Sequence, residues 1–297
     1  FVMRIGTKPM PQPQSRDMTL SKEILAQYER EGFFFPLDIL SPEEVGAVRC
    51  QLEDFEARYQ SHPIVGDGEF RTSCHLFLPC LDELTRHPAI LAAVSSILGN
   101  DLLVWGTSFF TKEPRSPDYV AWHQDLHYWG LDARDEVTAW VALSPASVES
   151  GCMRFIAASH TKEAAHADRP GDGAMLSRGQ ELASPVDESR AVNAPLLPGQ
   201  ASLHHGLTFH ASLPNRSNDR RIGFAIRYIK PSMRQAGGQA GVATLVQGDD
   251  SYHHFELAPR PERIAAPESI AVWQHALGIQ KKINFRNMNA PAEGKEP

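Results

Sequence analysis

Six segments between residues 101 and 229 have the composition of β-strands. They are rich in aromatic and β-branched residues and are bounded by clusters of Pro, Gly, Asn, Asp and Ser. No regular helical pattern separates them, so the fold we expect is an antiparallel sandwich or barrel. The expected strands lie at 101–113, 119–129, 136–145, 152–159, 200–212 and 221–229.

Helical patterns flank this β-rich region on both sides. Three precede it, at 21–32, 41–59 and 87–100, and one follows, at 267–278. The second begins with Ser41, Pro42 and Glu44, which form a capping box with proline at the first helical position. The whole chain is therefore interpreted as one domain, 1–297. Its expected parts are a helical region at about 20–100, a β core at about 101–230 and a C-terminal extension at 231–297.

The composition excludes several classes of protein. The 297 residues are 42% hydrophobic and 22% charged, with a net charge of −7 and no long basic run, which argues against a nucleic-acid partner. No apolar stretch is long enough to span a membrane, and the first residues lack the apolar core of a secretory signal. The four cysteines are sparse and form no CxxC pair. We expect reduced thiols in a cytoplasmic protein; the oligomeric state is left open.

The segment AWHQDLHYWGL (121–131) contains a candidate metal site. His123 and Asp125 lie two apart on an expected strand, so both side chains should point to one face. His210 is a candidate third ligand, but strand alternation puts His204 on the same face and leaves both histidines open. An HxD pair also arises by chance, and aromatic neighbours belong more often to a core than to a pocket.

Arg221 strengthens the metal hypothesis. It lies eleven residues after His210, across the turn PNRSNDR, and an antiparallel pairing would point both side chains into one cavity. Taken alone, Arg221 is explained as well by a surface ion pair. An arginine in such a cavity binds a dicarboxylate through two hydrogen bonds. Two imidazoles and one carboxylate form the facial triad of non-haem Fe(II) oxygenases, so the elements together indicate iron with a chelating 2-oxo acid.

Four motifs in order resemble the phytanoyl-CoA dioxygenase family of Fe(II)/2-oxoglutarate oxygenases. They are WHQDLHYWGL, VTAWVAL, SVESGCMRFIAASH and FHASLPNRSNDRRIGFAIRY, and the resemblance covers roughly residues 20–230. It implies a mainly β fold, a double-stranded β-helix (jelly roll, cupin-like), with flanking N-terminal helices and a late C-terminal helix. The implied cofactors are Fe(II), 2-oxoglutarate as cosubstrate and O2.

The resemblance also implies roles for individual residues. Iron would be bound by His123, Asp125 and His210. The cosubstrate would be bound by Arg221, Ser212 and Trp140, and we assign His75 to the role of an upstream family lysine. Related halogenases carry alanine or glycine where this chain has Asp125, so hydroxylation, or a related oxidation, is favoured over halogenation.

The implied activity is hydroxylation, or another oxidation, of an unactivated C–H bond of a small or medium-sized metabolite, with release of succinate and CO2. The partner is then a small-molecule substrate, with no nucleic acid and no membrane. The alternatives are a non-catalytic metal-binding protein with this fold and a non-oxidative, metal-dependent isomerase or lyase of cupin type.

Substrate residues are expected just beyond the metal ligands. His127 shares the strand alternation of His123 and Asp125, and Tyr128 and Trp129 would form an aromatic wall of a pocket. The long segment 160–189 could close over that pocket, with Arg178 as a polar contact. The alternative is that His127 contacts a metal ligand rather than the substrate and that Arg178 is exposed to solvent.

Overall fold

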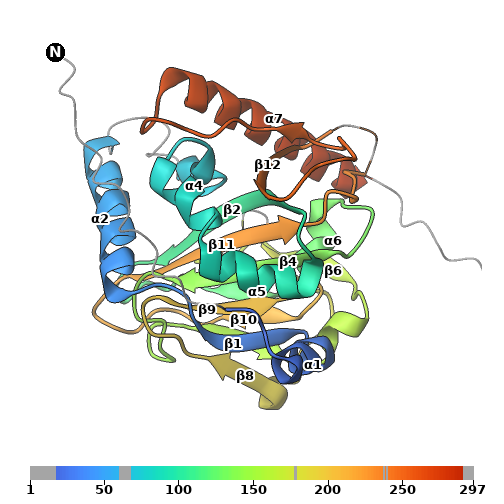
Figure 1. Ribbon diagram of the computed structural model, residues 1–297. Coiled ribbons are helices and arrows are strands. Elements are labelled where there is room, and N and C mark those ends of the chain that lie inside the picture. Colours follow the sequence, from blue (N-terminus) through green and yellow to red (C-terminus); the bar gives the residue numbers. More distant parts are fainter. Residues whose placement is uncertain (1–17, 60–67, 177–178, 237, 239, 290–297) are drawn as a thin grey trace, which may run out of the picture.

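Two facing β-sheets form the centre of the molecule (Figure 1). The computed structural model describes residues 18–59, 68–176, 179–236, 238 and 240–289. The major sheet has seven strands, antiparallel except for the last pair. Their order is β1 (Phe33–Asp38), β9 (Gln200–His204), β4 (Glu136–Ala142), β11 (Arg221–Ile229), β2 (Leu102–Lys112), β12 (Val242–Gln247) and β13 (Glu256–Leu257).

The minor sheet is antiparallel and has four strands. Their order is β3 (Val120–His123), β10 (His210–Ser212), β5 (Met153–Ile156) and β8 (Ala191–Ala194). A separate hairpin is formed by β6 (His166–Asp168) and β7 (Gln180–Leu182). Two sheets packed face to face enclose a space between their inner faces, and this space contains the candidate site.

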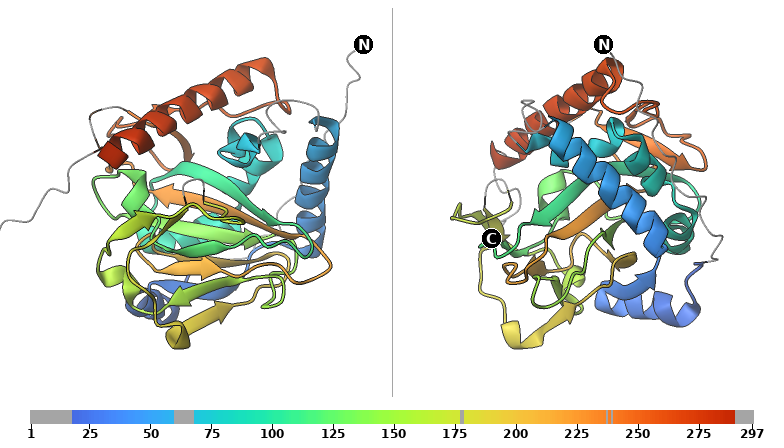
Figure 2. Two further views of the ribbon diagram at one scale, coloured as in Figure 1. Left: turned by 180° about the vertical axis from the view of Figure 1, so that it is seen from behind. Right: turned by 90° about the vertical axis from the view of Figure 1, so that its left-hand side faces the viewer.

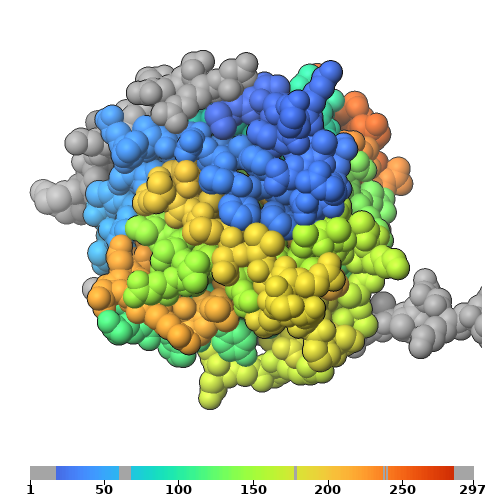
Figure 3. Space-filling view, turned by 90° about the horizontal axis from the view of Figure 1, so that it is seen from below, coloured from blue at the N-terminus to red at the C-terminus, as the bar shows by residue number. Residues whose placement is uncertain are grey.

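Helices cover the outer face of the major sheet. The helices over this face are α2 (Pro42–Tyr59), α4 (Pro79–Thr85), α5 (Pro88–Leu98) and α7 (Pro267–Asn289). The right view of Figure 2 shows α2 lying across the strands. Helix α1 (Lys22–Glu31) lies at the opposite end of the molecule, where N-terminal residues and residues near 200 make up much of the surface (Figure 3). The remaining helical turns are η1 (Glu69–Arg71), η2 (Cys74–Leu76), α6 (Leu126–Trp129), η3 (Ser159–Thr161) and η4 (Glu188–Arg190).

Strand β11 separates the hydrophobic core from the site by simple alternation. Ile222, Phe224 and Ile226 are fully buried and belong to the core between the major sheet and the helices. Arg221 and Arg227 have the opposite parity and line the cavity between the sheets. The same strand therefore contributes to the core on one face and carries two cationic side chains on the other.

The expected jelly roll with flanking helices is confirmed, although two strands are shorter than the sequence predicted. Strand β3 ends at His123, two residues before Asp125, and 200–212 is two strands, β9 and β10, in different sheets. The chain crosses from one sheet to the other between them, which a continuous strand would prevent. Segment 160–189 is more than a loop, since it carries the β6–β7 hairpin.

Two further observations bear on the chain as a whole. All four cysteines are free thiols, three of them buried. Among the described residues, no helix is both long and apolar enough to cross a lipid bilayer. The cytoplasmic location and the single-domain organisation stay predictions.

Candidate active site

Two adjacent strands of the minor sheet bring the histidines together. His123 on β3 is the direct cross-strand partner of His210 on β10, and their ring centroids are 4.0 Å apart. Asp125 follows β3 at the start of α6, where the backbone is already helical, and its Oδ1 lies 3.3 Å from His123 Nε2. The potential ligand atoms of all three buried residues lie within 4.8 Å of one another.

Backbone carbonyls orient both imidazoles. His123 Nδ1 lies 2.9 Å from the Ala121 carbonyl oxygen, and His210 Nδ1 lies 2.9 Å from that of Thr208. Because a carbonyl only accepts, each Nδ1 must carry the proton and donate it. Each Nε2 then keeps its lone pair for a metal ion, with the ring held by a backbone contact as in many metal sites.

The protonation states also suit metal binding. Burial opposes ionisation of Asp125, but the neighbouring His123, His210 and Arg227 side chains outweigh it, so the pKa of Asp125 is lowered. Burial, with His123 beside it, lowers the pKa of His210 well below its usual value. The site thus presents a carboxylate and neutral imidazole nitrogen, as a divalent cation requires.

His204 lies close to this cluster but comes from the major sheet. Its ring centroid is 4.8 Å from that of His210, and it lines the same cavity. The sequence left His204 and His210 open as third ligand. Among the described residues, the group that could hold a metal ion contains His210 and leaves out His204.

Two basic side chains lie side by side on the major sheet, and one of them, Arg221, lines the same cavity. Arg221 is the direct cross-strand partner of Lys112 on β2, and both are almost completely buried. Burial lowers the pKa of Arg221 to about 10, and burial together with Arg221 lowers that of Lys112 to about 6. Within the described parts of the chain, Nε and Nη2 of Arg221 have no hydrogen-bond partner. A buried, unpaired guanidinium is costly unless a ligand completes it.

The other expected cosubstrate residues surround this pair. Lys112 Nζ donates to Ser212 Oγ at 2.7 Å, and the Arg221 guanidinium lies 5.3 Å from the centroid of the Trp140 ring. Gly223, next to Trp140, leaves room for that ring, since a Cβ there would overlap it. Ser212, Trp140 and Arg221 therefore line one cavity with His123, Asp125 and His210.

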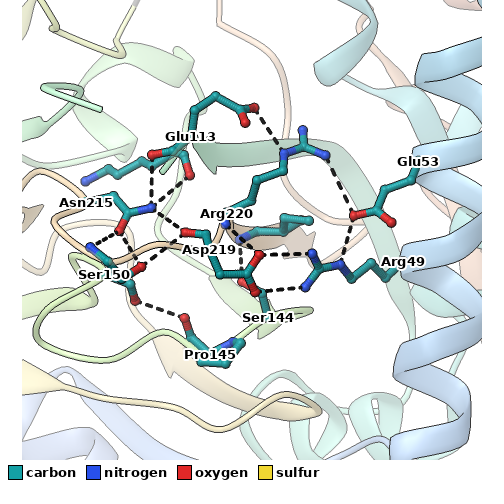
Figure 4. A network of polar contacts seen from close by, with 12 residues as sticks. Arg49, Glu53, Glu113, Ser144, Pro145, Ser150, Asn215, Asp219 and Arg220 are labelled. Atoms are coloured by element: carbon teal, nitrogen blue, oxygen red, sulfur yellow. Dashed lines mark hydrogen bonds and ion pairs between the residues drawn. The ribbon is translucent and has the colours of Figure 1, made fainter. Parts of the chain in front are cut away.

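The turn between β10 and β11 holds the cationic pair in position. Asn215 is buried, and its amide donates to the carbonyl oxygens of Lys112, Glu113 and Asp219. Figure 4 shows this contact beside a surface network in which Arg220 pairs with Glu113. The same turn crosses between sheets: β10 is in the minor sheet and β11 in the major sheet. The expected antiparallel pairing of His210 with Arg221 was therefore wrong, although both face one cavity.

A second, larger cavity of about 470 Å³ adjoins the metal cluster. His123, Asp125 and Arg227 line it, together with Tyr128 and Trp129, which were expected to form an aromatic wall. Trp129 stacks on Trp105 with ring centroids 4.9 Å apart. From segment 160–189, Met175, Leu176 and Gln180 also line it.

Two expected site residues lie elsewhere. His75 is buried beneath α7, where its ring nitrogens contact Thr107 and Thr244, and it lines a different small cavity. His127 is on a helical turn rather than a strand, so the alternation argument was wrong. It stacks on His166 and contacts Glu163. Arg178 lies outside the described residues.

Lys112 is the site residue that sequence reasoning missed. His75 was assigned to the lysine position of the family, whereas Lys112, the last residue of TSFFTK, is the next-to-last residue of the expected strand 101–113. Pairing that strand with 221–229 would have set Lys112 opposite Arg221. The alternation was visible in the sequence, but the strand order was not.

The chemistry of these residues fits both implied groups. Two imidazole nitrogens and a carboxylate suit Fe(II) with three positions left open, and the unpaired Arg221 nitrogens suit a distal carboxylate. This set of donor groups with open positions is the one found in the class of non-haem Fe(II) oxygenases.

Comparisons with known proteins agree. The model of the phytanoyl-CoA dioxygenase (PhyH) family matches residues 28–223, so the chain belongs to this family. A phytanoyl-CoA dioxygenase domain-containing protein 1 homolog of Caenorhabditis elegans is 28% identical over 163 residues, 52% of this chain and 56% of that protein. A probable alpha-ketoglutarate-dependent hypophosphite dioxygenase of Stutzerimonas stutzeri is 28% identical over 165 residues, 52% of this chain and 54% of that protein. The chain spans about half the length of these curated relatives.

A solved structure extends the likeness to most of the chain. The apo form of ThoJ, described as a non-heme monooxygenase, is 31% identical and superposes with a TM-score of 0.80. The superposition covers 90% of this chain and 99% of ThoJ. The flanking helices and both sheets are thus part of the likeness.

Proposed function

We propose that this protein is an Fe(II)/2-oxoglutarate-dependent dioxygenase. It hydroxylates, or otherwise oxidises, an unactivated C–H bond of a small or medium-sized metabolite, and it releases succinate and CO2. The observation that carries the proposal is one cavity with the metal-binding cluster His123, Asp125 and His210 near one end and the buried, unpaired Arg221 near the other. A metal site without turnover has no need of a second, cationic subsite.

Each end of the cavity has its own task. His123 and His210 offer Nε2, while each Nδ1–H donates to a backbone carbonyl oxygen, so both rings keep one orientation throughout. Arg221 and Lys112 bind the C5 carboxylate of 2-oxoglutarate, and Ser212 orients the Lys112 ammonium. Bound iron supplies activation of O2, which drives the decarboxylation of 2-oxoglutarate and the oxidation of substrate.

The protein also determines what reaches this centre. Trp140 packs on the Arg221 guanidinium and keeps water from the carboxylate. The larger cavity meets the metal cluster at His123 and Asp125, so a substrate bound there would lie next to the residues that would hold the iron. The likeness to two proteins, one described as a non-heme monooxygenase and the other as a probable alpha-ketoglutarate-dependent hypophosphite dioxygenase, supports this reaction class.

The test is succinate release with Fe(II), 2-oxoglutarate and O2 across a panel of small metabolites. We expect iron-dependent succinate in the wild type and none in Asp125→Ala. A wild-type protein that binds Fe(II) and 2-oxoglutarate but forms no succinate with any compound would favour the non-catalytic alternative.

A further inference from the structure

Three polar residues form a row across the major sheet, opposite the metal cluster. Thr138 on β4 is the direct cross-strand partner of His204 on β9 and of Arg227 on β11. All three line the cavity that contains His123 and Asp125. The row therefore forms the wall that faces the metal ligands, at the end of the cavity away from Lys112.

Each member of this row has hydrogen-bonding atoms that no described residue satisfies. These atoms are Nδ1 and Nε2 of His204, Oγ1 of Thr138 and Nε of Arg227. The side chains are buried, with 1%, 1% and 8% of the residue surface exposed. Unsatisfied groups of this kind cost roughly 1–3 kcal/mol each, so several in one line indicate a place where a polar ligand binds.

The charges around Arg227 indicate that this ligand is an anion. Arg227 Nη1 donates to Ser108 Oγ, and Nε lies 3.9 Å from Asp125 Oδ2. Asp125 and the 2-oxoglutarate dianion together offset the charges of Fe(II) and Arg221. The charges of the Lys112 ammonium and of Arg227 are then not compensated, and of these two side chains Arg227 is the one that lies beside Asp125. Glu136 compensates the charge of Arg227 less than an exposed carboxylate would, because burial raises the pKa of Glu136 well above its usual value and favours its neutral form.

Arg227 also connects the metal cluster to the larger cavity. It lines both cavities, and its guanidinium lies 5.3 Å from the centroid of the Trp129 ring. Beyond it, the larger cavity has an aromatic wall of Trp105, Trp129 and Tyr128. A ligand with one end on Arg227 would have its body against these rings.

We propose that the row His204, Thr138 and Arg227 binds a carboxylate of the primary substrate beside the metal. Arg227 Nε, the Thr138 hydroxyl and one His204 ring N–H donate to its oxygens, and the apolar or aromatic body of the substrate occupies the larger cavity. The substrate class is thus a carboxylic acid with an aromatic or apolar group near the carboxylate, next to Trp129. This inference rests on the proposed function, because it needs 2-oxoglutarate at the other end of the cavity.

The test compares 2-naphthoate with 2-naphthamide, which match in shape and differ in charge. Each is titrated anaerobically into the protein loaded with Fe(II) and 2-oxoglutarate, and the dissociation constant is read from Trp fluorescence and calorimetry. We expect the dissociation constant of naphthoate to be lower than that of the amide by about tenfold or more, because the carboxylate accepts a charge-assisted hydrogen bond. The preference should vanish in Arg227→Gln and survive in part in Arg227→Lys.

Controls separate the alternatives. Arg154 pairs with Glu188 outside the cavity, so Arg154→Gln should keep the wild-type preference, and a melting temperature checks that each variant folds.

Equal binding of acid and amide, no binding of the acid, or a preference unchanged in Arg227→Gln would overturn the inference. The inference would also be overturned if His204→Phe and Thr138→Val lost affinity for 2-oxoglutarate but still bound naphthoate more tightly than naphthamide. The row would then bind the cosubstrate. Failure of the proposed function would appear differently, as wild-type protein that does not bind 2-oxoglutarate in the presence of Fe(II).

Discussion

Lys112 and Arg221 face each other directly across the β2–β11 ladder and are buried at the same end of the cavity. Two cations this close would repel each other and lose their hydration on burial, so the charged form of Lys112 is disfavoured in the free protein. Both side chains can be charged at a low free-energy cost only when an anion binds between them. The predictions below begin with that anion, the distal carboxylate of 2-oxoglutarate.

Replacement of Arg221 by Ala should weaken 2-oxoglutarate binding by about 2–4 kcal/mol, because a buried carboxylate then loses its charge-assisted partner. Calorimetry with a redox-inert divalent metal measures this loss, and metal affinity should not change. Arg220→Ala is the matched control, since Arg220 makes surface ion pairs with Glu56 and Glu113. Equal 2-oxoglutarate affinity in both variants would remove Arg221 from this role.

Binding of 2-oxoglutarate should take up a proton. Burial and then Arg221 lower the pKa of Lys112 to about 6, so the amine is mostly neutral above that pH in the free protein. A bound dianion favours the ammonium and raises this pKa, so affinity should fall as pH rises from 6 to 8, by up to about tenfold per unit.

Calorimetry in buffers of different ionisation enthalpy detects the proton uptake, and Lys112→Met should abolish most of it. Binding of 2-oxoglutarate without proton uptake at pH 7.5 would contradict this prediction. It would mean that Lys112 has the same charge in the free protein and in the complex.

Asn215→Ala should disturb the same carboxylate site indirectly. The substitution leaves the carbonyl oxygens of Lys112, Glu113 and Asp219 without their donor, which should lower the free energy of unfolding by about 1–3 kcal/mol. The 2-oxoglutarate affinity should fall as well, because the turn precedes Arg221. Urea denaturation measures the loss of stability. Asn218→Ala, in the exposed part of the turn, is the control variant. A variant that is destabilised but binds 2-oxoglutarate normally would separate the turn from the site.

Gly223→Ala should displace Trp140. The added methyl group overlaps the Trp140 ring, and such overpacking costs about 1–3 kcal/mol. Because Trp140 also packs on Arg221, both the melting temperature and 2-oxoglutarate affinity should fall. Gly46→Ala on α2 is the control, since its methyl group would meet nothing within 4 Å. Unchanged binding in Gly223→Ala would show that the Trp140 ring does not shape the pocket.

The sequence predicted the elements better than their arrangement. Aromatic and β-branched composition with bounding turn residues located most strands of the jelly roll, and a capping box located α2. Strand order depends on contacts between distant segments, which single-chain patterns do not contain. Lys112 was missed for this reason, and His210 and Arg221 were paired in one ladder although they lie in different sheets.

Local patterns also failed where a strand ended early. The HxD spacing brought His123 and Asp125 together as expected, but Asp125 reaches the site from the first turn of α6. Continuing the alternation to His127 therefore pointed that side chain in the wrong direction. Tyr128 and Trp129 reach the larger cavity from the same turn.

The most direct test of the central claim is the visible charge-transfer absorption of 2-oxoglutarate chelated to Fe(II), recorded without O2. The account predicts a band in the wild type that needs both Fe(II) and 2-oxoglutarate. It predicts loss of that band in His210→Ala and its retention in His204→Ala, because His210 belongs to the metal-binding cluster and His204 lies outside it. A band that survives in His210→Ala and disappears in His204→Ala would contradict the account.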